Sequence, residues 1–187
     1  MILAGYEDEV IEEDPKNGNG RTSGVRYHPA GRITMMDNSA NAVLPVRGTY
    51  IKARRFMKLD HTYTDTNGNF RINKGYRNKA QVIVKFKNDW AKVRGVTHGL
   101  KIWQWAKPVK VKLGLFEKTA MQNVTRRFDY NANAETTQAI QFSAAHAITA
   151  VAEINQFCLT NSINTIPNNI NLWVTTSNWF ATLRHPC

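Results

Sequence analysis

The chain has 187 residues, of which 25 are Lys or Arg and 14 are Asp or Glu, for a formal net charge of +11 at pH 7. This length is enough for one folded domain with a core, and the positive charge indicates an anionic partner without choosing among nucleic acid, acidic glycan and membrane surface. The only cysteines, Cys158 and Cys187, exclude a framework of several disulfides, and they form no CxxC pair for structural zinc. No apolar run is long enough to cross a bilayer, and the N-terminus lacks the basic and then apolar order of a signal peptide.

The first thirty residues differ in composition from the rest. Six acidic residues and no basic one lie between residues 7 and 14, and residues 15–30 are rich in Asn, Gly and Pro. We expect a flexible acidic leader in front of a body that begins near Gly31. The alternative is that the leader folds back on the basic body, where residues 47–118 hold eighteen Lys and Arg against four acidic residues.

Alternating apolar and polar residues predict short strands in the body of the chain. The expected strands cover residues 31–37, 48–56, 80–88, 101–107 and 109–116. In the second of them, Ile51 and Ala53 share one face while Lys52 and Arg54 share the other. Pro108 divides the last two, because proline cannot donate to a ladder. Short strands separated by turns predict a small antiparallel sandwich or barrel.

The stretch HTYTDTNGNFRIN (61–73) holds an Asn-Gly pair between two alternating segments. Asn-Gly tolerates positive φ at both central positions of a type I′ turn, which predicts a β-hairpin. Its strands are expected at residues 61–64 and 69–73. The alternative is a calcium loop, since Asp65, Asn67 and Gly68 match the middle of one. Such a loop needs a closing glutamate and the chain has Lys74 there, so we favour the hairpin.

Beyond residue 117 the pattern becomes helical. Residues 134–158 are rich in alanine, contain no Gly or Pro and bring apolar side chains to one side, which predicts one long helix with Asn133 as its N-cap. A short strand is expected over 172–175. Three aromatic side chains in the last fifteen residues suggest that this part begins a second domain. We therefore divide the chain into a leader (1–30), a β-sandwich (31–117) and a helical extension (118–187).

Candidate catalytic residues are few. The five histidines form no HExxH or other close ligand pair, and neither Ser143 nor Cys158 lies in a nucleophile motif. Helical spacing puts His146 near Phe142 and Glu153, but we favour a histidine that is hydrogen-bonded within the fold over a metal ligand. The sequence therefore predicts no catalytic residue, no metal ligand and no cofactor in this chain.

The basic strands are the better candidate for binding. Their cations alternate with apolar positions, so a sheet of these strands would expose a cationic face, and two tryptophans could add stacking surfaces. The candidate residues are Lys52, Arg54, Lys85, Lys87, Trp103, Trp105, Lys110 and Lys112. The alternative, which we favour, is that the cations only solvate the sheet and the tryptophans lie in the core.

The predicted hairpin also carries a resemblance. YTDTNGNF (63–70) resembles the T-D-x-x-G-x-F hairpin of transthyretin-like, carboxypeptidase regulatory-like sandwich domains. The resemblance implies that Asp65 caps the turn, that Gly68 makes it tight and that Phe70 enters the core. It also implies the fold class that we expect, a transthyretin-like antiparallel β-sandwich followed by a long helix, α+β overall.

A narrower resemblance covers more of the chain. The segments VRGTYIKARRF (46–56), HTYTDTNGNF (61–70) and AQVIVKFKN (80–88) and the helical AAH (144–146) together look like the N-terminal region of bacterial secreted or lipoprotein zincin-like metallopeptidases. This implies a cell-envelope or secreted protein whose zinc-binding HExxH helix lies downstream. The chain has no HExxH, and Tyr6 stands where a lipobox has cysteine, so zinc is expected only with a further domain.

These patterns favour a non-catalytic accessory domain that interacts with its own downstream domain or with another envelope protein. The alternative is a stand-alone module that binds an anionic polymer through the basic face, a polysaccharide before nucleic acid. A hydrolase complete within these residues is the least favoured hypothesis.

Overall fold

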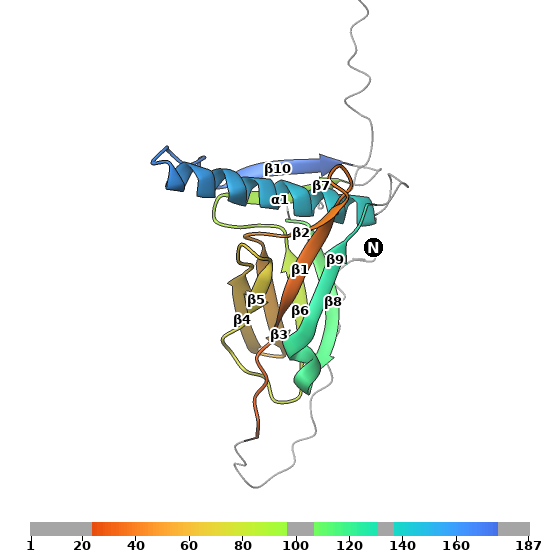
Figure 1. The fold of residues 1–187 in the computed structure, drawn as a ribbon. Helices are drawn as coiled ribbons and strands as arrows, with labels where there is room; N and C mark the ends of the chain where they lie inside the picture. The colour runs from red at the N-terminus through yellow and green to blue at the C-terminus, as the bar shows by residue number, and fades with distance from the viewer. Residues whose placement is uncertain (1–23, 97–106, 131–136, 176–187) are drawn as a thin grey trace, which may run out of the picture.

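The computed structural model describes residues 24–96, 107–130 and 137–175. Two β-sheets pack face to face as a sandwich, and a long helix with a third, two-stranded sheet lies across one end of it (Figure 1). The predicted fold class, a β-sandwich combined with a long helix, is confirmed.

The first sheet is built around β1 (Ala30–Asp37). One edge of β1 is antiparallel to both β2 (Ala42–Pro45) and β5 (Asn69–Arg71), and the other edge is parallel to β9 (Val124–Phe128). The sequence did not indicate β2 or β9, because runs of four and five residues show too little alternation to separate them from loops. The turn between β1 and β2 is held by Asp37, whose Oδ1 accepts from the backbone N of Ser39 at 2.8 Å.

The second sheet is fully antiparallel, in the order β4-β3-β6-β8. Its strands are β3 (Tyr50–Arg55), β4 (Lys58–Tyr63), β6 (Lys79–Lys85) and β8 (Lys110–Glu117). The predicted alternation is correct on its inner face, where Ile51, Ala53, Val82 and Val84 are fully buried. This leaves their strand neighbours on the outer face.

The helix α1 (Thr137–Thr160) packs against the third sheet, in which β7 (Ala91–Val96) runs parallel to β10 (Ile170–Thr175). The helix approaches β7 closely at Gly95, where an added β-carbon would lie 2.5 Å from Cγ2 of Ile140. The helix continues two residues beyond its predicted end, β10 begins two residues before its predicted start, and the proposed cap Asn133 lies outside the described residues.

Two contacts fix α1 to the sandwich. The backbone N of Arg47 donates to Oγ1 of buried Thr149 at 3.2 Å, and the Arg47 guanidinium pairs with the Glu153 carboxylate at 3.0 Å. Closer to the C-terminal end of the helix, Oδ1 of fully buried Asn155 accepts from the backbone N of Ile166 at 3.2 Å. The helix is therefore anchored on the loop before β3 and on the loop that leads to β10.

The predicted pairing of the 61–73 hairpin is wrong. β4 pairs with β3 in the second sheet, whereas β5 pairs with β1 in the first, so the Asn-Gly turn connects the two sheets. Gly68 has φ +75°, whereas the φ of Asn67 is not positive, so the turn is not type I′. The hydrogen bond from Gly68 N to Asp65 O at 3.0 Å closes a four-residue turn instead. The sequence indicated the turn correctly, but not the partners of its strands.

Two further expectations are corrected by strand pairing. In the predicted strand 109–116, regular alternation from Val109 and Val111 would put Leu115 in the core. A bulge in β8 opposite Val82 and Ile83 reverses this alternation, so Leu115 is 46 % exposed while Phe116 packs against the core. The sandwich also extends past the expected boundary at residue 117. A 3-10 helix, η2 (Lys118–Asn123), leads into β9, which is hydrogen-bonded to β1.

Candidate functional site

The outer face of the second sheet gathers most of the predicted cations. Strand register aligns Tyr50 with Lys85 and Lys85 with Lys110, and in the next row Lys52 with Ile83 and Ile83 with Lys112. Arg54 lies one pleat further along and donates from Nε to Oε1 of Gln81 at 3.0 Å. Five cations from three strands therefore share one face, and Trp103 and Trp105 lie outside the described residues.

Three aromatic rings lie at one end of this face. Tyr50 stacks on His61, with ring centroids 4.8 Å apart and an interplanar angle of 19°. The ring of Tyr63 meets both edge-on, at 5.7 Å from Tyr50 and 6.5 Å from His61. None of these rings was among the predicted site residues. Tyr50 lies two residues before Lys52 on the same strand, and the pairing of β3 with β4 puts His61 opposite Lys52 and Tyr63 opposite Tyr50.

Lysines surround the Tyr50 ring. Nζ of Lys87 lies 4.4 Å from its centroid and Nζ of Lys85 lies 5.8 Å from it, both within the range of cation–π attraction. These contacts bring Lys87, which follows the end of β6, into the same group. We call the group the lysine face. Its members are Tyr50, Lys52, His61, Tyr63, Lys85, Lys87 and Lys110.

The lysine face is electrostatically crowded. Burial lowers the pKa of Lys85, and the positive charges of Lys52, Lys87 and Lys110 lower it further. A bound anion would relieve this mutual repulsion, because it favours the charged form of each lysine. Acidic side chains also lie near this end: the charge of Asp60 adds to burial in raising the pKa of Tyr50, and Oδ1 of Asp89 accepts from the Tyr63 hydroxyl at 3.1 Å. Burial, this hydrogen bond and the charge of Asp89 raise the pKa of Tyr63 to about 12, so Tyr63 stays neutral near pH 7.

The floor of the lysine face is apolar. Ile83 points outward between Lys52 and Lys112, yet it is only 7 % exposed, and the polar Gln81 in the next row is equally buried. Lysine side chains carry long methylene stems that can cover apolar neighbours while their amino groups remain in water. A ligand on this face would therefore meet positive charge and the rings of His61 and Tyr63. The exposed side chains of Leu59 and Leu115 lie in the row beyond Lys52 and Lys112.

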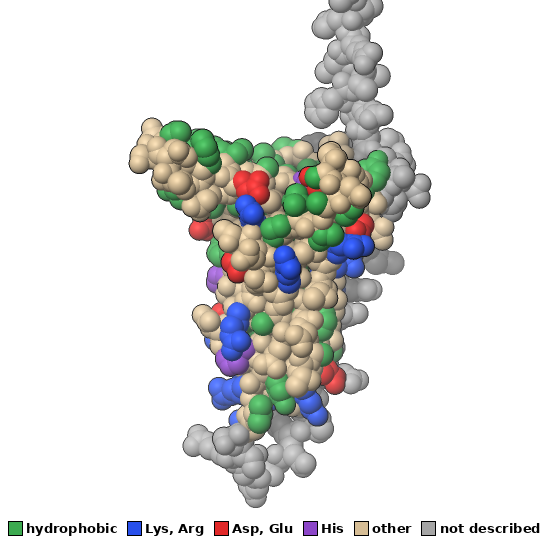
Figure 2. Space-filling model, in the orientation of Figure 1, with side chains coloured by type: hydrophobic (Ala, Val, Ile, Leu, Met, Phe, Trp, Pro, Cys, Tyr) green, Lys and Arg blue, Asp and Glu red, His purple; other side chains and the backbone are tan. Residues whose placement is uncertain are grey.

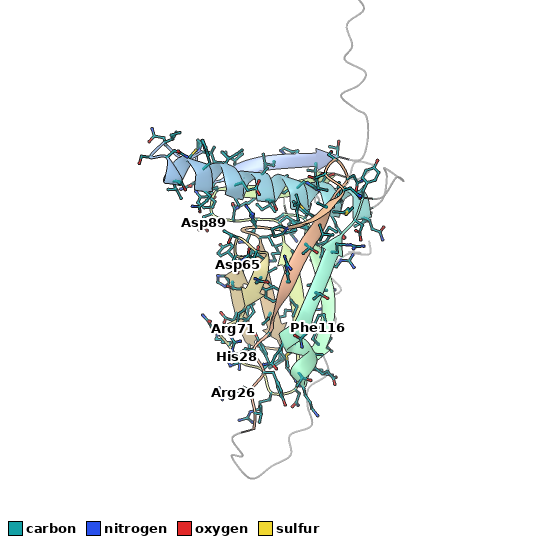
Figure 3. The ribbon with its side chains drawn as sticks, in the orientation of Figure 1. Arg26, His28, Asp65, Arg71, Asp89 and Phe116 are labelled. Carbon is teal, nitrogen blue, oxygen red and sulfur yellow. The ribbon has the colours of Figure 1, made fainter. Side chains whose placement is uncertain are left out.

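The turn residues implied by the first resemblance form the connection between the two sheets. Oδ1 of Asp65 accepts from the backbone N of Asn67 and of Asn69, each at 2.8 Å. A β-carbon on Gly68 would collide with the carbonyl oxygen of Ile33, and Phe70 is 5 % exposed in the core. These contacts build and close the turn, and Figure 3 shows Asp65 at the end of the sandwich near α1.

His146 and Cys158 both lie in surroundings typical of residues that stabilise the fold. Nε2 of His146 lies 3.2 Å from the Met36 carbonyl oxygen, and its ring contacts that of Phe142 at 4.5 Å between centroids. Glu153, which helical spacing placed near His146, pairs with Arg47 instead. Cys158 is a buried free thiol. Among the residues that the structure describes, no three His, Cys, Asp or Glu side chains come together in a way that could hold a metal ion.

A separate cavity of about 340 Å³ lies where β9 leads toward α1. It is lined by Arg126, Arg127, Phe128, Asp129, Tyr130, Gln138 and Gln141. The acidic residue in the lining, Asp129, is already paired with Arg127, whose Nε lies 2.7 Å from its Oδ1. None of the predicted site residues lines this cavity.

Comparison with known proteins gives little further information. No protein-family model and no curated protein matches the chain. Among solved structures, 5-hydroxyisourate hydrolase from Klebsiella pneumoniae is similar over 54 % of this chain and 88 % of its own, with 9 % identity and a TM-score of 0.30. The 9R-lipoxygenase from Cyanothece PCC8801 is similar over 78 % of this chain and 26 % of its own, with 14 % identity and a TM-score of 0.21. Because both TM-scores are below 0.5, the assignment of a β-sandwich with one long helix rests on the strand pairing itself.

Proposed function

We propose that this chain is a non-catalytic interaction domain, and that its lysine face binds an anionic polysaccharide. The observation that carries the proposal is the packing of Lys85 and Lys87 against the Tyr50 ring, with Lys52 and Lys110 close enough to lower the pKa of Lys85. Concentrating positive charge in this way lowers stability unless a partner compensates it.

The type of cation favours a carboxylated or sulfated polymer over specific reading of nucleic acid. The lysine face holds four lysines, whose ammonium groups act as point charges without fixed orientation. The neighbouring Arg54 is engaged with Gln81, so its planar fork is directed along the sheet. Exposed His61 and partly exposed Tyr63 offer ring surfaces on which sugar rings can pack.

The absence of catalysis is part of the same proposal. It is supported by the roles of the nucleophile and base candidates, since His146 is hydrogen-bonded to a backbone carbonyl and Cys158 is buried. A stoichiometric zinc ion that is lost on His146→Ala would contradict it.

We further propose that the domain works in the bacterial cell envelope or outside the cell, in front of a metallopeptidase-like domain. The support is the resemblance of residues 46–88 and of the helical AAH to such proteins. The intact mass of the protein from its native host tests this proposal: a species much heavier than 21.3 kDa supports it, and one of 21.3 kDa contradicts it.

Direct binding tests the polysaccharide proposal. The protein should bind heparin and alginate at low salt and lose affinity steeply as salt is added, because binding releases counterions. A neutral dextran is the control and should not bind. At about 20 mM salt the attraction between charges is screened over a longer distance than the ~10 Å found at 0.1 M, so it remains strong. Absence of binding to both polyanions at this salt concentration would contradict the proposal. Tighter binding to single-stranded DNA than to either polysaccharide would instead identify nucleic acid as the ligand of this face.

A further inference from the structure

The turn between β3 and β4 presents an exposed apolar pair. Arg55 pairs with Lys58, so Phe56 and Met57 alone form the loop. Phe56 is 70 % exposed and Met57 is 85 % exposed, the highest values among the large apolar side chains of the described residues. Loops of two residues are ordinarily polar or glycine-rich, so this pair needs an explanation beyond turn formation.

The backbone conformation of the turn is also unfavourable for phenylalanine. Phe56 has φ +45°, whereas Met57 is not among the residues with positive φ. Positive φ at the first central position alone is the pattern of a type II′ turn, which favours glycine there. A bulky residue in this conformation is strained, and strained positions concentrate where the side chain has a task. The turn would form more easily with glycine at position 56, so its geometry does not account for the phenylalanine.

A cluster of cations begins directly beside the pair. Lys58, directly after Met57, donates from Nζ to the carbonyl oxygen of Gly75, and this Nζ lies 5.1 Å from the centre of the Tyr76 ring. Burial lowers the pKa of Lys58, and so do the nearby charges of Arg26, Lys74 and Arg77. The neighbouring acid is Asp60, which accepts from the backbone N of Lys74 at 2.8 Å.

This cationic end is distinct from the lysine face. β3 runs from Tyr50 to Arg55, about 17 Å at 3.3 Å per residue. Its first residue lies near α1, since a β-carbon on nearby Gly48 would lie 3.0 Å from Cβ of Ala152. The Phe56-Met57 turn is therefore at the opposite end of the sandwich. Figure 3 shows Arg26 at that end too, far from α1.

We propose that the Phe56-Met57 turn docks on an anionic lipid surface. The two apolar side chains enter the boundary between headgroups and acyl chains, while the neighbouring cations meet lipid phosphates. Charge complementarity selects a lipid surface as the partner, because exposed apolar residues beside a cluster of Lys and Arg match its apolar interior and negative exterior. The first sheet lacks this arrangement: in Figure 2, which views the molecule from the side of β1 and β9, the Lys and Arg side chains are spread over the surface.

Co-sedimentation with vesicles tests the proposal. The full chain is incubated at low salt with vesicles of phosphatidylcholine alone, or with 30 % phosphatidylglycerol. Binding is expected only to the second composition. The double variant Phe56→Ser/Met57→Ser should bind these vesicles at least about tenfold more weakly, because two apolar side chains no longer enter the interface. The matched control is Phe157→Ser/Leu159→Ser, which removes two apolar side chains that are 62 % and 57 % exposed on α1.

The control variant should bind within about twofold of the wild type, and all proteins should keep the thermal unfolding midpoint within a few degrees, since exposed positions contribute little to stability. Failure of the wild type to bind anionic vesicles would overturn the proposal, as would equal losses in the two double variants. The Phe56-Met57 variant should retain heparin binding. Loss of vesicle binding with heparin binding intact separates this surface from the lysine face, and parallel loss of both would contradict the separate site.

Discussion

Tyr50 stacks on His61 at 4.8 Å while the ammonium groups of Lys87 and Lys85 lie 4.4 and 5.8 Å from the Tyr50 ring centroid. One aromatic ring thus contacts His61 from β4 and two lysines from the end of β6 and the residues just after it. The stack fixes the ring, and the ring in turn orients the two lysines. This relationship makes Tyr50 the organising residue of the lysine face and gives a first prediction.

Tyr50→Ala should lower the affinity for heparin about tenfold, because removing the ring releases both lysines from their cation–π contacts and removes the stack. Tyr50→Phe is the matched control, since it keeps the ring and should stay within about twofold of the wild type. Isothermal titration calorimetry measures both. A Phe variant as weak as the Ala variant would show that the hydroxyl group, and not the ring, does the work.

Alkaline pH should destabilise the protein through Tyr63 and Tyr76. Burial and the Asp89 carboxylate raise the pKa of Tyr63 to about 12, and burial and the charge of Asp60 raise that of Tyr76 to about 12. Unfolded tyrosine titrates near 10. Between pH 10 and 12 the unfolded chain has therefore lost protons that the folded chain keeps, so the free energy of unfolding falls as pH rises.

Spectrophotometric titration at 295 nm should show two of the six tyrosines ionising near pH 12. Tyr63→Phe should make the loss of stability above pH 10 less steep, as followed by urea unfolding at each pH. An unchanged slope in this variant would show that Tyr63 titrates normally in the folded protein.

Gly68→Ala should lower the free energy of unfolding by at least about 2 kcal/mol, since the new β-carbon both strains the backbone at φ +75° and collides with the Ile33 carbonyl. Gly24→Ala is the control, because nothing lies within 4 Å of its added β-carbon. Chemical denaturation should find that control within about 0.5 kcal/mol of the wild type. Equal values for the two variants would mean that the turn between the sheets is not as tight as described.

The docking of α1 can be tested with two isoleucines on the same helix. Ile148 is fully buried, while Ile154 is 50 % exposed. Ile148→Ala should cost about 2–5 kcal/mol of folding free energy, because it leaves a cavity between helix and sandwich, whereas Ile154→Ala should cost much less. Similar losses in the two variants would contradict the packing of this helix against β7 and β10.

The sequence predicted the elements with strong patterns and missed those without. The strands around Ile33, Ile51 and Val84 and the long helix were recognised because their apolar positions repeat over seven residues or more. β7, with only Ala91 and Val93 as buried markers, gave no prediction, and neither did β2 or β9. Short strands depend on partners for their stability, and a single sequence does not name those partners.

The same limit explains the errors in pairing and in the site. Asn67-Gly68 indicated a turn, but which strands it joins depends on contacts with Ile33, which lies in β1, the partner of β5 in the first sheet. The bulge at Gly114 reversed the faces of Leu115 and Phe116 without a change in composition that could reveal it. The cationic face followed from alternation within each strand, whereas the convergence on Tyr50 required the register between strands.

The heparin affinity of a charge-reversal pair tests the central claim most directly. Lys85→Glu/Lys87→Glu changes the net charge as much as Arg71→Glu/Lys118→Glu, whose two exposed cations lie on other elements. The account predicts that the first variant binds heparin at least about tenfold more weakly than the second, with a shallower dependence on salt. Equal losses in the two variants would show that heparin binding reports net charge alone, and would contradict a binding function for the lysine face.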